Sequence, residues 1–225
     1  MPQILPFFYY VFMKFDGLIL DVDGTIWNTT SIVAEAWNKA IDERFPGIKH
    51  VTADILKGQF GKTMDVIADN LFTSLSYEDK QLLLNKCCQE EQAALLFNEK
   101  NITYTGVLET IRSICKKLPI FIVSNCQSGY IELVIKKNDI KDCISDFECY
   151  GNNGNTKDKN ILLIAERNNL KAPVYVGDTQ GDYEACKKAG LPFIWAAYGF
   201  GKPEDDNFYA KIEEFSELEK ILLND

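Results

Sequence analysis

The sequence has few of the residues that build soft-metal and thiol sites. It contains one histidine, His50, and its seven cysteines include no C-x-x-C pair. These counts do not give the ligand spacing of a structural zinc site. We therefore interpret the cysteines as free thiols, mostly buried, in a reducing cytoplasmic compartment.

A cationic excess and a long apolar run are also missing. The net charge is −9, which excludes the basic footprint of a nucleic-acid-binding protein. The apolar stretch near the start of the chain has roughly ten residues, whereas a membrane span needs about 20. It also lacks the basic start and the cleavage site of a signal peptide. We interpret residues 1–12 as an upstream extension and expect neither nucleic acid nor membrane as a partner.

Short apolar segments alternate with helical periodicity over most of the chain. Strands are predicted at residues 16–22, 118–125, 146–150, 172–178 and 191–198. Helices are predicted at residues 107–117, 129–137, 158–169, 180–189 and 216–223. Such alternation is typical of a doubly wound α/β fold with a parallel sheet.

One region interrupts this alternation. Between residues 30 and 101 the apolar residues recur at helical spacing, and no strand is evident. This pattern predicts an all-helical cap at residues 29–103, inserted into a core formed by residues 1–28 and 104–225. Hinges are expected near residues 28–30 and 102–105.

Carboxylates gather where the predicted strands end. Asp21 and Asp23 end the first strand, and Asp178 ends a later one, with Asp182 four residues further on. Ligands of open α/β sheets bind beyond the carboxyl ends of the strands, so these side chains are expected to share one crevice. Clustered carboxylates repel one another, and a hard divalent cation relieves that repulsion. The pattern therefore predicts a Mg²⁺ site.

This set of groups suits phosphoryl transfer. A carboxylate beside Mg²⁺ can attack phosphorus, while a second carboxyl group protonates the leaving oxygen and later deprotonates water. Ser124, at the end of another predicted strand, can bind phosphate oxygens together with the backbone amides that follow it. A lysine from another loop would balance the charge.

Three motifs resemble those of a known family. "DVDGT", "IVSN" and "GDTQGD" occur in this order, each at a predicted strand end, and they resemble the haloacid dehalogenase-like (HAD) hydrolase superfamily. The resemblance covers the chain from about residue 14 and includes a helical cap after the first motif. It implies a Rossmann-like core, with Asp21 as the nucleophile. Asp23 would be the general acid and base, and its carbonyl would also bind Mg²⁺.

The same resemblance implies roles for five further residues. Thr25 and Ser124 would contact the phosphate, with Asn125 beside it. Asp178 would bind the metal, and Asp182 would be either a metal ligand or a partner of the ligands.

The lysine of the family is less clearly placed. The segment "GNNGNTKDKNI" offers Lys157 and Lys159 and lacks the proline that follows this lysine in many relatives. We favour Lys157, because it precedes the helix predicted from residue 158.

The segment "GQFGKT" at residues 58–63 is similar to a nucleotide-binding loop. The full pattern requires glycine where this chain has Leu56, and no predicted strand precedes the segment. We therefore reject that function. Within a cap, this loop could instead cover the active site, with Lys62 in contact with the substrate, or it could be an ordinary connection between helices.

These observations predict a Mg²⁺-dependent phosphomonoester hydrolase. The expected substrate is a small soluble phosphate, either phosphoglycolate-like, a sugar phosphate or a nucleotide. A sugar phosphomutase of the same superfamily is the alternative, since it would use the same catalytic residues, and a non-catalytic binding protein on this fold is a further one. The partner is expected to be a small phosphorylated metabolite, and the protein a monomer or a weak homodimer.

Overall fold

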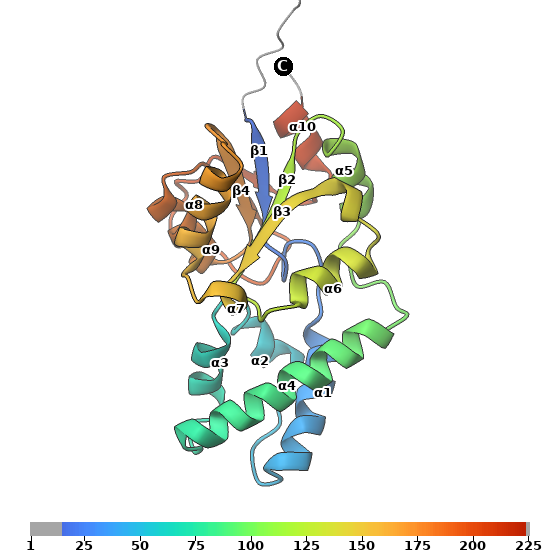
Figure 1. Cartoon of the computed structure of the whole chain (residues 1–225), viewed down its shortest axis with the longest axis vertical. Coiled ribbons are helices and arrows are strands. Elements are labelled where there is room, and N and C mark those ends of the chain that lie inside the picture. The colour runs from blue at the N-terminus through green and yellow to red at the C-terminus, as the bar shows by residue number, and fades with distance from the viewer. Residues whose placement is uncertain (1–14, 224–225) are drawn as a thin grey trace, which may run out of the picture.

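A six-stranded parallel sheet forms the centre of the larger part of the molecule (Figure 1). The computed structural model describes residues 15–223, so the predicted extension at residues 1–12 lies outside the described residues. The strand order is β3-β2-β1-β4-β5-β6. The strands are β1 (Gly17–Leu20), β2 (Ile120–Ser124), β3 (Ile144–Cys149), β4 (Pro173–Gly177), β5 (Phe193–Ala196) and β6 (Ala210–Ile212).

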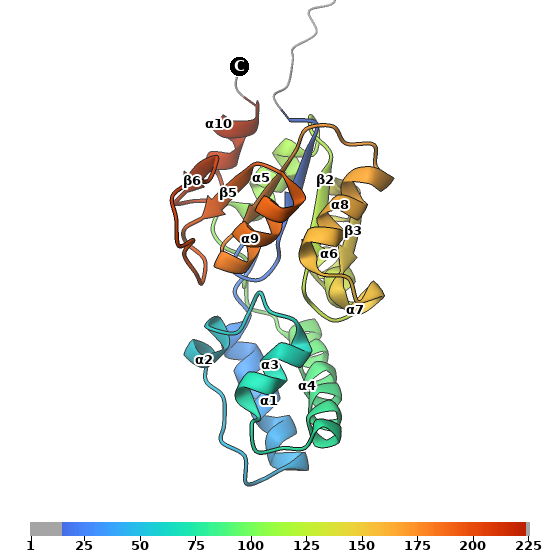
Figure 2. The same cartoon turned by 90° about the vertical axis from the view of Figure 1, so that its left-hand side faces the viewer.

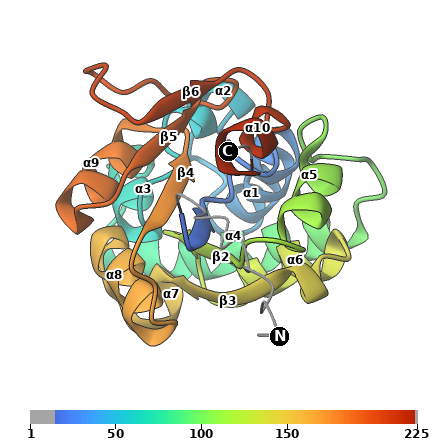
Figure 3. The same cartoon turned by 90° about the horizontal axis from the view of Figure 1, so that it is seen from above.

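Alternate residues of the strands build two separate apolar cores, one on each face of the sheet. In β1, Leu18 and Leu20 pack on one face and Ile19 on the other. The first face is covered by α5 (Val107–Ile114), α6 (Tyr130–Lys137) and α10 (Glu217–Leu223); the second by α8 (Lys157–Arg167) and α9 (Gln180–Ala189). Figure 3 shows these helices on both sides of the sheet. The predicted doubly wound fold is confirmed.

Three short elements were not predicted. They are β6, the 3₁₀ helix η1 (Lys141–Cys143) and the one-turn helix α7 (Tyr150–Asn153). Strand β6 has three residues, of which only Ile212 is buried, so it carries no readable periodicity. It exists because it pairs with β5 at the edge of the sheet.

The four helices of residues 30–97 form a unit of their own, referred to here as the cap. They are α1 (Thr30–Arg44), α2 (Ala53–Lys57), α3 (Met64–Leu71) and α4 (Tyr77–Phe97). Their apolar faces share a third core, which includes Trp37, Ile41 and Leu83. Figures 1 and 2 show the cap beyond the carboxyl ends of the strands. Ser76 is the N-cap of α4, because its hydroxyl accepts a hydrogen bond from the Asp79 amide.

The two connections between the sheet domain and the cap run side by side. The amide of Asn28 donates to the Ile102 carbonyl over 2.8 Å, and the amide of Tyr104 donates to the Ile26 carbonyl over 3.1 Å. The first contact joins the two predicted hinges, and the second lies directly beside it, so any hinge motion has to act on both connections together.

Among residues 15–223, no helix combines the length and the apolar character needed to cross a bilayer.

Candidate active site

The strand order of the sheet reverses between β1 and β4, although all strands run parallel. From β1 the sheet grows outward through β2 to β3, and from β4 it grows the other way through β5 to β6. This switch point opens a crevice at the carboxyl ends of the two central strands. Asp21 directly follows β1, and Asp178 directly follows β4. The sheet therefore places both carboxylates at one point, although 157 residues separate them in sequence (178 − 21).

A buried lysine links the carboxylates of this crevice. The Lys157 ammonium donates to Asp21 Oδ1 over 2.8 Å and to Asp182 Oδ1 over 2.5 Å. All three side chains are at most 4% exposed. Lys159, the alternative lysine, is exposed on the same helix. The helix was predicted to begin at residue 158, which was wrong: α8 begins at Lys157, so its first turn aims this side chain into the crevice.

Burial and the lysine act in opposite directions on these carboxyl groups. Burial raises the pKa of Asp21 to about 7, even though the Lys157 ammonium pulls it down. For Asp182, burial again acts to raise the pKa, but Lys157 and hydrogen bonds from Thr179 bring it below its usual value. Burial acts to lower the pKa of Lys157, yet the carboxylates of Asp182 and Asp21 raise it overall. The lysine therefore stays protonated, and Asp182 stays ionised beside it.

Asp178 has a carboxylate oxygen that no group within residues 15–223 satisfies. Its Oδ2 accepts a hydrogen bond from the Phe200 amide over 2.6 Å, while its buried Oδ1 has no partner. Burial, together with the charges of Asp182 and Asp21, raises the pKa of Asp178 well above its usual value. An unsatisfied buried carboxylate oxygen is costly unless a cation approaches it.

Three of the four predicted carboxylates offer ligand atoms for one ion. Single oxygens of Asp21, Asp178 and Asp182 lie within 4.8 Å of one another. This all-oxygen set fits a hard divalent cation such as Mg²⁺. Both oxygens of Asp182 already accept protein hydrogen bonds, so Asp21 and Asp178 are the freer ligands, and Asp182 is better placed to hold Lys157.

A glycine allows the motif loop to approach this cluster. Gly24 has φ +83°, and a Cβ at this position would lie 2.1 Å from Asp178 Oδ2. Any larger residue would displace the carboxylate, and the left-handed backbone would be strained as well. The glycine of "DVDGT" is thus required by packing against the "GDTQGD" segment.

Asp23 points to a different set of partners. Its Oδ1 accepts hydrogen bonds from Tyr130 Oη at 2.8 Å, from Thr29 Oγ1 at 2.9 Å and from Trp27 Nε1 at 3.1 Å. Burial raises the pKa of Asp23 to about 7, although these donors act to lower it. Sequence reasoning missed Tyr130, which lies 107 residues away and carries no local signal. A carboxyl group beside Asp21 with its pKa raised to about 7 suits an acid–base role.

The predicted phosphate-binding residues gather at the same crevice. Ser124 is buried at the end of β2, and with Asn125 it lines a cavity that also contains Asp21 and Asp23. The buried Thr25 Oγ1 and Asn125 Oδ1 have no hydrogen-bond partner within the described residues. Thr25 itself does not line the cavity. Thr25, Ser124 and Asn125 remain predictions as phosphate ligands. The free Thr25 hydroxyl can donate to a phosphate oxygen, whereas Asn125 Oδ1 only accepts and Asn125 Nδ2 already donates to Gly61 O at 2.7 Å.

The cap closes the cavity from the opposite side. Only about 30 Å³ remains between the two parts. The cap contributes Trp37, Phe60, Lys62 and the buried Glu91 to the lining. The Lys62 ammonium donates to Gly58 O at 3.0 Å and to Gln59 Oε1 at 3.1 Å, so it is held within its own loop. Glu91 was missed by sequence reasoning, because helical spacing alone does not show which residue of α4 faces the cavity.

Comparisons with known proteins place this geometry in a family. A model described as haloacid dehalogenase-like hydrolase matches residues 18–196. A predicted phosphoglycolate phosphatase from Haemophilus somnus has a similar structure, with 18% identity, TM-score 0.81 and coverage of 93% of this chain and 99% of its own. A predicted phosphatase from Clostridium acetobutylicum has 16% identity, TM-score 0.79 and coverage of 93% and 98%.

A third similar structure is a haloacid dehalogenase-like family hydrolase from Streptococcus pneumoniae, with 14% identity, TM-score 0.79 and coverage of 92% and 98%. No curated protein sequence matches the chain. The family match spans the strands that carry all three motifs, from β1 to β5. As its motifs predicted, this chain belongs to the haloacid dehalogenase-like hydrolases.

Proposed function

We propose that this hydrolase cleaves small soluble phosphomonoesters with Mg²⁺, through a phosphoryl group carried on Asp21. The observation that carries the proposal is the buried cluster in which Lys157 joins Asp21 and Asp182 beside Asp178. The relatives from Haemophilus somnus and Clostridium acetobutylicum, named as predicted phosphatases, support the same reaction class.

In the first step, a carboxylate oxygen of Asp21 attacks the phosphorus atom. The bond between phosphorus and the ester oxygen breaks, and Asp23 gives its proton to the leaving alkoxide. Asp23 suits this task because burial raises its pKa to about 7, so it holds a proton near neutral pH.

In the second step, water attacks the phosphoryl group on Asp21. Asp23 accepts a proton from this water, the bond between phosphorus and the Asp21 oxygen breaks, and inorganic phosphate leaves. Both carboxyl groups then return to their starting protonation states.

Positive charge is needed because nucleophile and substrate are both anionic. Lys157 supplies a fixed ammonium 2.8 Å from Asp21 Oδ1. A Mg²⁺ ion held by Asp21 and Asp178 would offset the remaining repulsion. Thr25, Ser124 and Asn125 would bind the phosphate oxygens.

The cap would exclude bulk water during the first step and let substrate in by moving away. In the closed arrangement the cavity of about 30 Å³ is too small for a phosphate ester. Opening and closing of the cap is therefore part of the proposed cycle.

A small phosphorylated metabolite is the proposed partner, in a reducing cytoplasmic setting. All seven cysteines are free thiols in the structure, which supports that setting.

Metal removal is the direct test of this proposal. Hydrolysis of p-nitrophenyl phosphate should fall at least about 100-fold after metal depletion with a chelator and return on addition of Mg²⁺, because metal-assisted charge stabilisation contributes several kcal/mol. Circular dichroism of the depleted protein should show that the fold persists. Undiminished activity in excess chelator would refute the metal-dependent mechanism.

A further inference from the structure

The cap holds a buried carboxyl group that has no cationic partner in the part of the chain that the structure describes. Glu91, on α4, is 4% exposed and lines the same cavity as Asp21 and Asp23. Its Oε2 accepts a hydrogen bond from Trp37 Nε1 at 2.7 Å, and its Oε1 accepts one from Gln127 Nε2 at 3.0 Å. Within residues 15–223 no lysine or arginine forms an ion pair with it.

The preceding residue on the same helix, Glu90, is neutralised by two lysines. Glu90 is paired at the surface with Lys39 at 2.5 Å and with Lys86 at 2.8 Å. Glu91 instead faces inward, where a glutamine could accept the same hydrogen bond from Trp37 without the cost of burying a charge. Its burial therefore calls for an explanation beyond the stability of the cap.

The hydrogen bonds of Glu91 leave some of its acceptor positions unused. Each carboxylate oxygen can accept about two hydrogen bonds, and each receives one from a protein side chain. The remaining acceptor sites belong to a side chain that lines the cavity above the nucleophile. A hydroxyl or an ammonium group can fill them, whereas a carboxylate cannot.

The acidic groups of the cavity also disfavour a substrate that ends in a carboxylate. Asp21, Asp23 and Glu91 all line this cavity, which therefore already contains three acidic side-chain groups. A substrate with a carboxylate at its far end would add another one, at a cost of several kcal/mol when water is excluded.

We propose that Glu91 selects phosphomonoesters whose non-phosphate end donates hydrogen bonds, through a hydroxyl or an ammonium group, and rejects those that end in a carboxylate. The inference rests on the proposed phosphatase function and makes its substrate class narrower. Trp37 and Phe60, which line the cavity beside Glu91, would contact the carbon chain of such a substrate.

A purely mechanical role for Glu91 makes a different prediction. Gln127 belongs to the sheet domain, so its hydrogen bond to Glu91 also ties the closed cap to the core. If that tie were the whole role, removal of the Glu91 charge would change the turnover of every phosphate equally. Selection predicts a change that depends on the end group of the substrate.

The test compares substrates that differ only in that end group. Phosphates of two- and three-carbon chains that end in a hydroxyl, an ammonium or a carboxylate are assayed with the wild type and with Glu91→Gln, with p-nitrophenyl phosphate as the reference. The wild type should prefer the hydroxyl or ammonium substrates over the carboxylates by about tenfold or more in kcat/KM. Glu91→Gln should reduce that ratio by about tenfold, with each rate expressed relative to p-nitrophenyl phosphate in the same protein so that a general change in turnover cancels.

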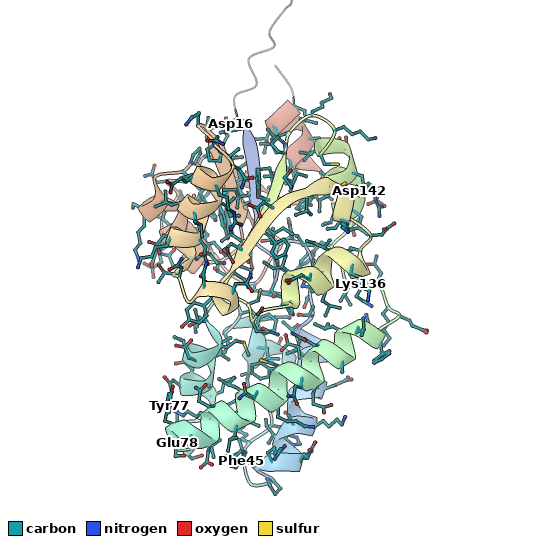
Figure 4. The ribbon with its side chains drawn as sticks, in the orientation of Figure 1. Asp16, Phe45, Tyr77, Glu78, Lys136 and Asp142 are labelled. Atoms are coloured by element: carbon teal, nitrogen blue, oxygen red, sulfur yellow. The ribbon has the colours of Figure 1, made fainter. Side chains whose placement is uncertain are left out.

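Glu78→Gln is the matched control, because Glu78 is exposed on the same helix. Figure 4 shows it at the end of α4 that lies away from the sheet. Its substrate ratios should equal those of the wild type.

Two results would overturn the selection role while the phosphatase proposal stands. One is hydrolysis of p-nitrophenyl phosphate by a wild type that does not disfavour the carboxylate substrates; this measurement needs no variant. The other is an equal loss with all substrates in a folded Glu91→Gln protein. If the wild type hydrolyses no phosphate at all, the proposed function fails, and the selection role fails with it.

Discussion

The two walls of the cavity hold their acidic groups in different ways. On the sheet side, Asp21 and Asp182 share the ammonium of Lys157, and Asp178 completes a set of oxygens that fits a cation. On the cap side, Glu91 has two neutral hydrogen-bond donors and no cation among the described residues. The sheet side is thus organised around positive charge, as an anionic reaction centre requires.

The two walls also differ in how they are supported. Asp21 and Asp178 directly follow two adjacent parallel strands, so their relative positions are fixed by backbone hydrogen bonds. The cap residues stand on helices joined to the sheet domain by two adjacent connections. From this difference we expect the chemistry to depend on the sheet side and substrate choice to depend on the cap side. The following predictions test that expectation, beginning with the largest expected effect.

Asp21→Asn should remove turnover. An amide of nearly the same shape cannot attack phosphorus, so kcat for p-nitrophenyl phosphate should fall by about 10⁴-fold or more. The exposed Asp65 on α3 provides the control, since Asp65→Asn should retain normal activity. Activity of Asp21→Asn within about tenfold of the wild type would remove Asp21 from the nucleophile role.

The lysines of α8 provide a matched pair. Lys157→Met leaves buried carboxylates without their cation, so kcat should fall by about 10²–10³-fold. The free energy of unfolding should fall by about 3–5 kcal/mol. Lys159→Met, two residues away on the exposed side, should change neither quantity. Denaturant unfolding and steady-state kinetics measure both, and the reverse pattern would assign the active-site lysine to Lys159.

Asp23→Asn should slow turnover and yet stabilise the fold at alkaline pH. Burial raises the pKa of Asp23 from about 3.8 to about 7, so the folded state keeps a proton that the unfolded state loses above about pH 4. The resulting stability is present below pH 4 and is lost as the pH rises to 7. Asparagine does not ionise, and its oxygen can still accept from Tyr130, Thr29 and Trp27.

In metal-free buffer, the Tm of Asp23→Asn should therefore exceed that of the wild type by roughly 10 °C at pH 8 and match it at pH 4, because a pKa raised from 3.8 to about 7 corresponds to about 4 kcal/mol. Thermal unfolding at the two pH values measures this difference. A variant that is less stable at pH 8 than at pH 4, relative to the wild type, would contradict a raised pKa for Asp23.

Lys62→Ala should have the smallest effect and should leave the catalytic step unchanged. The Lys62 ammonium is held by its own loop, and the residue lines the cavity from the cap. We expect KM to rise several-fold for a substrate that contacts the cap, since an exposed charge contributes about 1 kcal/mol. KM for p-nitrophenyl phosphate should be nearly unchanged. Equal loss with both substrates would show that this loop is not a specificity element.

The sequence by itself determined the fold class and the edge of the sheet at which the site lies. The apolar strands end at Asp21, Ser124 and Asp178, and parallel strands bring their carboxyl ends together. Local periodicity was also sufficient for the helices of the cap. These features depend on residues that are close in the chain, which is why they could be predicted.

Only the tertiary structure decided which of two neighbouring lysines enters the site and which distant residues lie beside each other. Lys157 and Lys159 share one short segment, and packing against the sheet buries the first and exposes the second. Tyr130 reaches Asp23 across 107 residues, and Glu91 faces the cavity only because α4 packs on α1 with that side inward. Burial and long-range contact depend on how elements pack, and a single sequence carries no local signal of either.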